Sequence, residues 1–336
     1  IRLEAPPDLV DAYRFQAGQH LTLRRTFDGE EVRRNYSVCV SPLEGELRIA
    51  IKQMERGLFS SWANGVLKEG DLIDVMAPRG SFTWIFDVGK AGSYLAFAGG
   101  SGITPVLSIL KTALAVEPKS RFTLFYGNRA TASIIFLEEL AGLKNRYLDR
   151  LEVYHFLEDE ADDTELFNGL LDFDRCGEAL DALADVAALD AAFICGPGLM
   201  MDAAEAALEA RGLPADQILI ERFTTTSLSA RQAAAAASLA RKAAGASISV
   251  ILDGRRAKVA FNPERGAILD NVRAAGLPAP FACKGGVCAT CRAKVISGTV
   301  KMKLNYGLTA QEVAEGFVLT CQAIPTSEAV TISYDG

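Results

Sequence analysis

The chain has 336 residues, 49% of them hydrophobic, and a formal net charge of −7. This length is enough for two or three domains, each with its own core. The acidic balance argues against nucleic acid as a partner, and because no apolar run is long enough to cross a bilayer, we expect no membrane association. No signal peptide is visible, although Ile1 is not a Met, so we expect a short piece to precede it.

Residues 1–90 alternate short β-rich runs with turn residues, which predicts a small antiparallel β-barrel. The expected strands cover residues 21–24, 35–40, 47–52 and 72–76. A helix is expected to start at Gly57, between the third and the fourth of these strands. The segment is therefore interpreted as one domain of the chain.

Two short motifs in this segment carry candidate chemistry. The first, on a strand, consists of Arg34, Asn35, Tyr36 and Ser37. Alternation along the strand places the cation and the aromatic ring on one face, with the amide and the hydroxyl on the other. The second motif is the helix start, with Gly57, Leu58, Phe59 and Ser60. Exposed N–H groups there favour a phosphate, although such a start is often only a cap; together the motifs fit a bound flavin dinucleotide.

Residues 91–223 change to a repeated pattern of strand, glycine turn and helix, which predicts an α/β domain with a parallel sheet. Strands are expected at 94–98, 121–126 and 191–195, and a helix at 105–116. Open parallel sheets bind ligands at the carboxyl ends of their strands. The three turns at those ends are therefore candidate nucleotide-binding sites.

The turn residues suit a nicotinamide dinucleotide. Small residues that would let a pyrophosphate approach the first helix are Gly100, Gly102, Thr104 and Pro105. The second turn is Gly127, Asn128 and Arg129, and its arginine suits the 2′-phosphate of NADPH better than the free hydroxyl of NADH. The third turn contains Cys195, Gly196, Pro197 and Met200. Cys195 could face the nicotinamide or fill a small apolar space at the strand end.

Residues 224–246 are threonines and alanines with scattered cations, and we interpret them as a linker. Alanine favours helix, but no apolar stripe is evident, so a mobile or marginally helical connector is expected. Residues 247–336 then begin with a hairpin at 247–252 and 256–261 and a helix at 267–275. This last segment has ten Lys or Arg against seven Asp or Glu, a formal charge of +3. The charge indicates either an ordinary solvated surface or a docking patch for an acidic partner.

Four cysteines in the last segment have the plant-type spacing of [2Fe–2S] ligands, C-x4-C-x2-C followed by C-x29-C. They are Cys283, Cys288, Cys291 and Cys321. Zinc is the competing ligand, but structural zinc sites usually pair two short cysteine knuckles, and Cys321 stands alone. The two histidines of the chain, His20 and His155, belong to no constellation, which disfavours a Rieske centre.

The remaining cysteines, Cys39, Cys176 and Cys195, lie in unrelated contexts. An odd remainder of this kind is typical of a reducing cytoplasm. The cytoplasm is therefore the expected location.

Taken together, these motifs resemble the ferredoxin-NADP⁺ reductase superfamily. A C-terminal cluster domain makes the chain similar to oxygenase reductases that carry flavin, nicotinamide nucleotide and cluster in one polypeptide. Residues 301–308 and 316–327 resemble the reductase subunits of phenylacetyl-CoA epoxidase complexes. The resemblance implies an FAD-binding β-barrel, an NAD(P)-binding α/β domain and a β-grasp ferredoxin domain of the α+β class.

By this resemblance, Arg34 meets the FAD phosphates, Tyr36 packs on the flavin and Ser37 hydrogen-bonds near flavin N5. Phe223 lies at the face where the nicotinamide enters, and FMN is the alternative flavin. The implied activity is electron transfer from NADPH, or NADH, through FAD and the [2Fe–2S] cluster to an oxygenase.

The implied partner is a di-iron phenylacetyl-CoA epoxidase. A Rieske-type dioxygenase or another monooxygenase is the alternative partner. A redox-sensing module and a zinc-stapled interaction protein are alternatives from other functional classes. The linker suggests that the cluster domain swings between its own flavin and the oxygenase.

Overall fold

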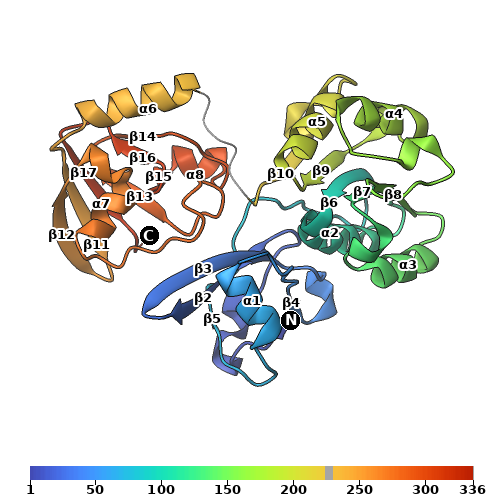
Figure 1. The fold of residues 1–336 in the computed structure, drawn as a ribbon, viewed down its shortest axis with the longest axis horizontal. Helices are drawn as coiled ribbons and strands as arrows, with labels where there is room; N and C mark the ends of the chain where they lie inside the picture. The colour runs from blue at the N-terminus through green and yellow to red at the C-terminus, as the bar shows by residue number, and fades with distance from the viewer. Residues whose placement is uncertain (224–229, 336) are drawn as a thin grey trace. The chain divides into compact units, whose positions relative to one another are not determined.

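The computed structural model describes residues 1–223 and 230–335. Its described residues belong to two compact units. The first comprises residues 1–21, 36–70 and 82–222, and the second comprises residues 22–35, 71–81 and the chain from Phe223 onward. The predicted barrel segment thus contributes to both units. Figure 1 shows the elements along the chain.

The N-terminal part is built from short antiparallel strands, as predicted. They are β1 (Arg2–Leu3), β2 (His20–Phe27), β3 (Glu30–Ser37), β4 (Leu47–Arg48) and β5 (Asp74–Val75), in the sheets β3-β2-β5 and β1-β4. The predicted strands 47–52 and 72–76 were too long, because only two residues of each form a strand, with one isolated bridge from Ile49 to Val38. Leu72 is 97% exposed, so its apolar side chain did not mark a buried strand. Helix α1 (Leu58–Gly65) begins directly after Gly57, where the sequence predicted it.

The middle of the chain forms a five-stranded, wholly parallel sheet of order β10-β9-β6-β7-β8. Its strands are β6 (Ser93–Gly99), β7 (Arg121–Asn128), β8 (Leu151–Leu157), β9 (Ala191–Cys195) and β10 (Ile218–Glu221). Its helices are α2 (Ile103–Val116), α3 (Leu137–Arg146), α4 (Phe173–Leu183) and α5 (Gly198–Glu209). The parallel sheet was predicted correctly, but β8 and β10 were missed.

The parallel sheet is covered on both faces, which explains its nearly continuous apolar strands. Residues of α2 and α3 share one buried cluster with Tyr94, Phe122 and Phe193. Residues of α4 and α5 share another with Phe97 and Phe125 from the opposite face. The helices flank the sheet in Figure 1. The strand ends and the following turns are therefore held on a rigid core.

The C-terminal part is a mixed sheet of order β12-β11-β17-β13-β15 with a small second sheet, β14-β16. Its strands are β11 (Ser247–Leu252), β12 (Arg255–Ala260), β13 (Arg292–Ser297), β14 (Val300–Met302), β15 (Phe317–Leu319), β16 (Ala323–Pro325) and β17 (Ala329–Ser333). Its helices are α6 (Ala230–Lys242), α7 (Ile268–Ala274) and α8 (Ala310–Ala314). The predicted hairpin and the predicted helix at 267–275 are confirmed as β11, β12 and α7.

Helix α6 corrects the expectation that residues 224–246 offer no apolar stripe. Ala240 of α6 is buried in the same core as β11 and α7, Ala236 and Leu239 of the helix pack against that core, and Ala243 and Ala246 after the helix are buried in it too. Small alanine side chains let the helix approach closely, so an alanine-rich surface can dock without large apolar residues. The rest of the predicted connector, residues 224–229, lies outside the described residues. Among the described helices, none has the length and apolarity of a membrane span.

Candidate active site and cluster loop

The flavin-type motif on β3 contains a buried hydroxyl with no partner. Ser37 is 3% exposed, and its Oγ makes no hydrogen bond within the described structure. Buried hydroxyls are nearly always bonded, so this atom is suited to a polar group of a ligand. Tyr36 lies beside Phe59 with ring centroids 5.9 Å apart, and Arg34 is exposed on the same strand. These residues fit a bound flavin.

The start of α1 is shaped as an anion site. A Cβ at Gly57 would lie 2.4 Å from the hydroxyl of Ser60, so the turn requires glycine there. The Gly57 N–H already donates to Met54 O at 3.0 Å. The first-turn N–H groups of Leu58, Phe59 and Ser60 have no intrahelical acceptor and can donate to a phosphate.

A buried polar cluster joins the start of β2 to the ends of β9 and β10. His20 is 4% exposed, and its Nδ1 lies 3.6 Å from a carboxylate oxygen of Glu221. Glu221 is the register partner of Cys195 across the two strands. Burial raises the pKa of Cys195 well above its ordinary value, and the Glu221 carboxylate raises it further. Cys195 is therefore held as a neutral thiol at the strand end.

The glycine turns bring the ends of β6 and β9 into direct contact. A Cβ at Gly102 would lie 2.0 Å from the carbonyl oxygen of Cys195, and one at Gly196 would lie 2.7 Å from the Met200 methyl. The turn before α2 therefore lies against the turn before α5, and this close approach requires residues without side chains. Two helix N-termini at one sheet edge form a suitable place for a pyrophosphate.

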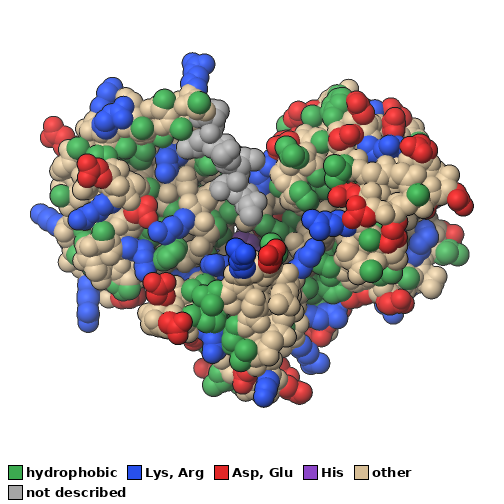
Figure 2. Space-filling view, in the orientation of Figure 1, with side chains coloured by type: hydrophobic (Ala, Val, Ile, Leu, Met, Phe, Trp, Pro, Cys, Tyr) green, Lys and Arg blue, Asp and Glu red, His purple; other side chains and the backbone are tan. Residues whose placement is uncertain are grey.

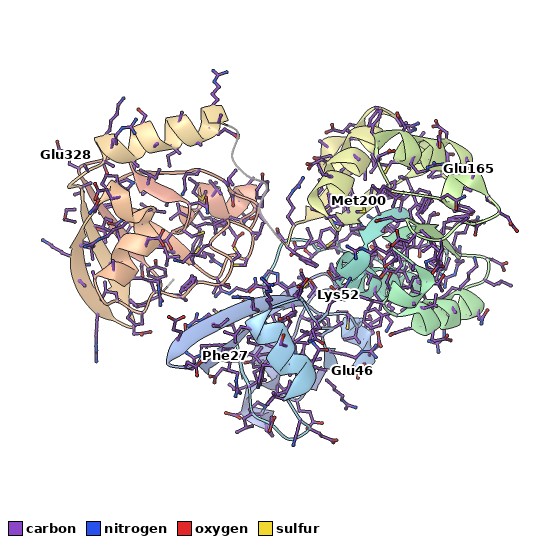
Figure 3. All side chains as sticks on the ribbon, viewed as in Figure 1. Phe27, Glu46, Lys52, Glu165, Met200 and Glu328 are labelled. Atoms are coloured by element: carbon purple, nitrogen blue, oxygen red, sulfur yellow. The ribbon has the colours of Figure 1, made fainter. Side chains whose placement is uncertain are left out.

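A lysine that the sequence interpretation did not single out lies at this edge. The Nζ of Lys52 is 4.0 Å from the position of a Cβ at Gly100, which has a positive φ of 50°. Figure 3 labels Lys52, and also Met200. The ammonium group of Lys52 adds a positive charge next to the turn before α2.

The end of β7 carries the predicted coenzyme-selecting turn. Tyr126 donates a hydrogen bond from its hydroxyl to Gly100 O at 2.9 Å, which ties β7 to the first glycine turn. Asn128 is 5% exposed, and its Nδ2 has no partner among the described atoms. Arg129 is exposed at the strand end. A buried amide and an exposed guanidinium thus stand side by side where the sheet edge would receive a nucleotide.

The four predicted cluster ligands lie as two thiol pairs, Cys283 with Cys288 and Cys291 with Cys321. A hydrogen bond with Cys283 lowers the pKa of Cys288 to about 5, and a hydrogen bond with Cys291 lowers the pKa of Cys321. Within the described chain, no three His, Cys, Asp or Glu side chains converge as a site for one ion. Two ligand pairs suit a two-iron cluster better than a single zinc ion.

The cluster loop is shaped by close backbone contacts. Ala289 and Lys284 adopt positive φ values of 51° and 52°, unusual for residues with a Cβ. Behind the loop, a Cβ at Gly307 would lie 2.6 Å from Val287 O. Within the second unit, the buried hydroxyls of Thr290 and Thr22 lie 3.3 Å apart. The stretch around Gly307 is thus a wall of the cluster site.

The structure places the predicted site residues in separate groups. One group lies on β3 and at the start of α1, a second lines the edge of the parallel sheet, and the third is the four cysteines. Phe223 follows β10 directly and is 39% exposed. Sequence patterns missed Lys52, and they gave Glu221, part of the motif that ends at Phe223, no role of its own, because both roles depend on contacts between segments far apart in the chain. His20, which lies at the start of β2, is the residue that contacts Glu221, so it was the sequence feature that could have drawn attention to this carboxylate.

Three family models match the chain in the predicted order. They are an oxidoreductase FAD-binding domain at residues 7–84, an oxidoreductase NAD-binding domain at 97–206 and a 2Fe-2S iron-sulfur cluster binding domain at 250–326. FAD, a nicotinamide nucleotide and a [2Fe–2S] cluster are therefore the groups of this chain. The cluster model decides against the zinc alternative.

Curated relatives match nearly the full length. A component of the 1,2-phenylacetyl-CoA epoxidase of Escherichia coli is 43% identical over 335 residues, covering 100% of this chain and 93% of the relative. The 3-ketosteroid-9-alpha-monooxygenase ferredoxin reductase component of Mycobacterium tuberculosis is 37% identical, covering 99% and 88%.

Solved structures share the fold. Phthalate dioxygenase reductase, a modular structure for electron transfer from pyridine nucleotides to [2Fe-2S], has a TM-score of 0.54 at 24% identity, covering 95% of this chain and 88% of that one. An intact type IV self-sufficient cytochrome P450 monooxygenase has a TM-score of 0.67 at 24% identity, covering 95% and 37%. The chain therefore belongs to the family of oxygenase reductases, flavoprotein oxidoreductases that join FAD-binding, NAD-binding and 2Fe-2S domains in one polypeptide.

Proposed function

We propose that this reductase delivers electrons from NADPH to a di-iron epoxidase that acts on phenylacetyl-CoA. The observation that carries the electron-transfer part is the plant-type spacing of the four cysteines, matched by a 2Fe-2S family model, in the same chain as FAD-binding and NAD-binding domains. The match to the Escherichia coli epoxidase component along the whole chain, at 43% identity, supports the choice of partner. The predicted resemblance of residues 301–308 and 316–327 points in the same direction.

The flavin site is assigned to β3 and the start of α1. When bound, FAD accepts a hydride from the nicotinamide and supplies electrons singly to the [2Fe–2S] cluster. Ser37 offers its unpartnered hydroxyl to a polar atom of the ring, and Tyr36 supplies an aromatic surface. Arg34 and the N–H groups of α1 neutralise the phosphates. The match of residues 7–84 to an FAD-binding domain favours FAD over FMN.

The nucleotide site is assigned to the edge formed by the three glycine turns. Gly100, Gly102, Gly196 and Pro197 allow the pyrophosphate to approach two helix starts, while Thr104 and Pro105 shape the first turn of α2. Cys195 is fully buried at the end of β9, so its side chain is assigned to support the turn beside the place where the nicotinamide ring would lie. By the family resemblance, Phe223 remains assigned to the face of the flavin where the nicotinamide enters.

The coenzyme is proposed to be NADPH rather than NADH. Arg129 is exposed at the end of β7, where a 2′-phosphate can pair with it, and no carboxylate takes its place in the turn. Lys52 would add attraction for the pyrophosphate of either coenzyme. A reducing cytoplasm, proposed from the cysteine content, would supply NADPH and keep the three remaining thiols reduced.

Partner selectivity tests the proposal. Purified reductase would be combined in turn with a di-iron phenylacetyl-CoA epoxidase and with a Rieske-type dioxygenase, and product formation per NADPH oxidised would be measured. Coupled turnover with the epoxidase alone is expected. Coupling only with the Rieske enzyme would reassign the partner, and rapid reduction of an artificial acceptor without coupling to either would contradict the proposed partner. Slow hydride transfer to any acceptor would favour a redox sensor.

A further inference from the structure

Gln322, the residue after the fourth cluster cysteine, joins two sides of the ligand cage. It is 5% exposed, and a buried amide of this kind requires hydrogen-bond partners. Its Nε2 donates to the carbonyl oxygen of Lys284 at 2.9 Å and lies 3.5 Å from the Sγ of Cys321. One side chain thus contacts a ligand and the loop that carries the other three.

The contact between Gln322 and Lys284 lies at a point where the loop backbone adopts unfavourable φ values. Lys284 has a positive φ of 52°, a conformation that costs free energy for a residue with a Cβ. Gly286 has a φ of 80°, and a Cβ built there would lie 3.0 Å from Cγ of Gln322. Gln322 therefore holds the Lys284 carbonyl with its amide and packs its methylene against Gly286. The loop turn is built around this side chain.

The Thr290 side chain hydrogen-bonds Cys288, and backbone N–H groups donate to cluster sulfurs elsewhere in the loop. Gly285 N–H donates to Cys283 Sγ at 3.2 Å, and Cys283 N–H approaches Cys288 Sγ at 3.4 Å. Any residue could supply those donors, whereas the Gln322 amide depends on its side chain. N–H donors near cluster sulfurs stabilise the more negative, reduced state and so raise the reduction potential. Burial strengthens this effect because the local dielectric is low.

We propose that Gln322 is a positioning residue that raises the reduction potential of the cluster, by donating toward Cys321 and by fixing the Lys284 carbonyl. This inference rests on the proposed function only in requiring that the cluster be bound. It goes beyond the ligand set, because Gln322 is not a ligand. Its consequence is that reduction of the cluster by the flavin becomes more favourable.

The test uses Gln322→Met, which keeps the length without a donor, and Gln322→Glu, which keeps the shape but adds a charge. Gln311→Met is the matched control, because Gln311 is exposed on α8 and bonds only Glu315 in the described structure. Midpoint potentials would be measured by redox titration with EPR detection, alongside iron content. At a fixed solution potential, the ratio of reduced to oxidised cluster should fall about tenfold in Gln322→Met, the size of one hydrogen bond to a charged group.

Gln322→Glu should lower that ratio further, and Gln311→Met should leave it unchanged. Full cluster content with an unaltered potential in both Gln322 variants would overturn the inference. Should the variants fail to load iron, the donor role of Gln322 would be tested by EPR on wild-type protein labelled with 15N at the glutamine side-chain amides. A 15N coupling to the reduced cluster is expected, and its absence would refute the donor role. Absence of a cluster from the wild type would instead refute the proposed function.

Discussion

The contact between Gly102, in the turn before α2, and the end of β9 predicts a large effect of Gly102→Ala. The added methyl group would lie 2.0 Å from the Cys195 carbonyl oxygen and 2.8 Å from the Gly196 nitrogen, where about 3.2 Å or more is normal for such contacts. Both obstacles are backbone, so no side-chain rotation can relieve the clash. The first turn of α2 must therefore move by roughly 1 Å relative to β9.

Two consequences follow from that displacement. Overpacking of a rigid core should lower the free energy of unfolding by about 1–3 kcal/mol. The glycine turns should also lose their shared geometry, and because misplacement by about 1 Å can cost two orders of magnitude, NADPH affinity should fall at least about tenfold. Flavin and cluster contents should stay near wild type, since their assigned sites lie elsewhere in the chain.

Gly142→Ala is the matched control, because Gly142 lies inside α3 and a Cβ there meets nothing within 4 Å. It should stabilise the protein by up to about 1 kcal/mol through helix propensity. Denaturant unfolding would measure stability, and titration calorimetry with NADP⁺ would measure affinity. Wild-type stability and affinity in Gly102→Ala would show that the close approach of the two turns is not as described.

Three further predictions test other parts of the account. Arg129→Ala should lower kcat/KM for NADPH about tenfold with little change for NADH, and an equal loss with both coenzymes would contradict pairing with a 2′-phosphate. Ser37→Ala should slow flavin reduction in stopped-flow measurements by about tenfold or more while flavin stays bound, and an unchanged rate would remove the assigned hydrogen bond. Ala240→Glu should destabilise the C-terminal part by at least about 2 kcal/mol, because the carboxylate would enter its core; wild-type denaturant stability would show that α6 does not dock.

Local chemistry predicted the strongest parts of the site. The cysteine spacing, the helix start at Gly57 and the glycine turns each depend on residues close in sequence, and their elements are where the sequence placed them. The sheet type was also predictable, because strand and helix alternate along the chain. The strands β8 and β10 were missed, since residues 151–157 mix charged and aromatic residues and residues 218–221 are only four long.

Long-range contacts explain what the sequence did not reveal. His20 and Glu221 are 201 positions apart, and only the fold brings their side chains within 3.6 Å. Helix α6 shows a different limit, because its apolar surface consists mostly of alanines, which a search for large apolar residues overlooks.

Figure 2 shows that both charge signs are interspersed over the drawn faces, so the formal +3 of residues 247–336 does not form a single patch there.

The most direct test of the central claim is an anaerobic visible spectrum of the purified protein before and after an excess of NADPH, enough to reduce both the flavin and the cluster, with NADH run in parallel. The account predicts flavin bands over a broad cluster absorption, both bleached, and more rapidly by NADPH. Bleaching of the flavin bands alone would contradict electron transfer to the cluster, and a spectrum that neither nucleotide changes would contradict the whole route.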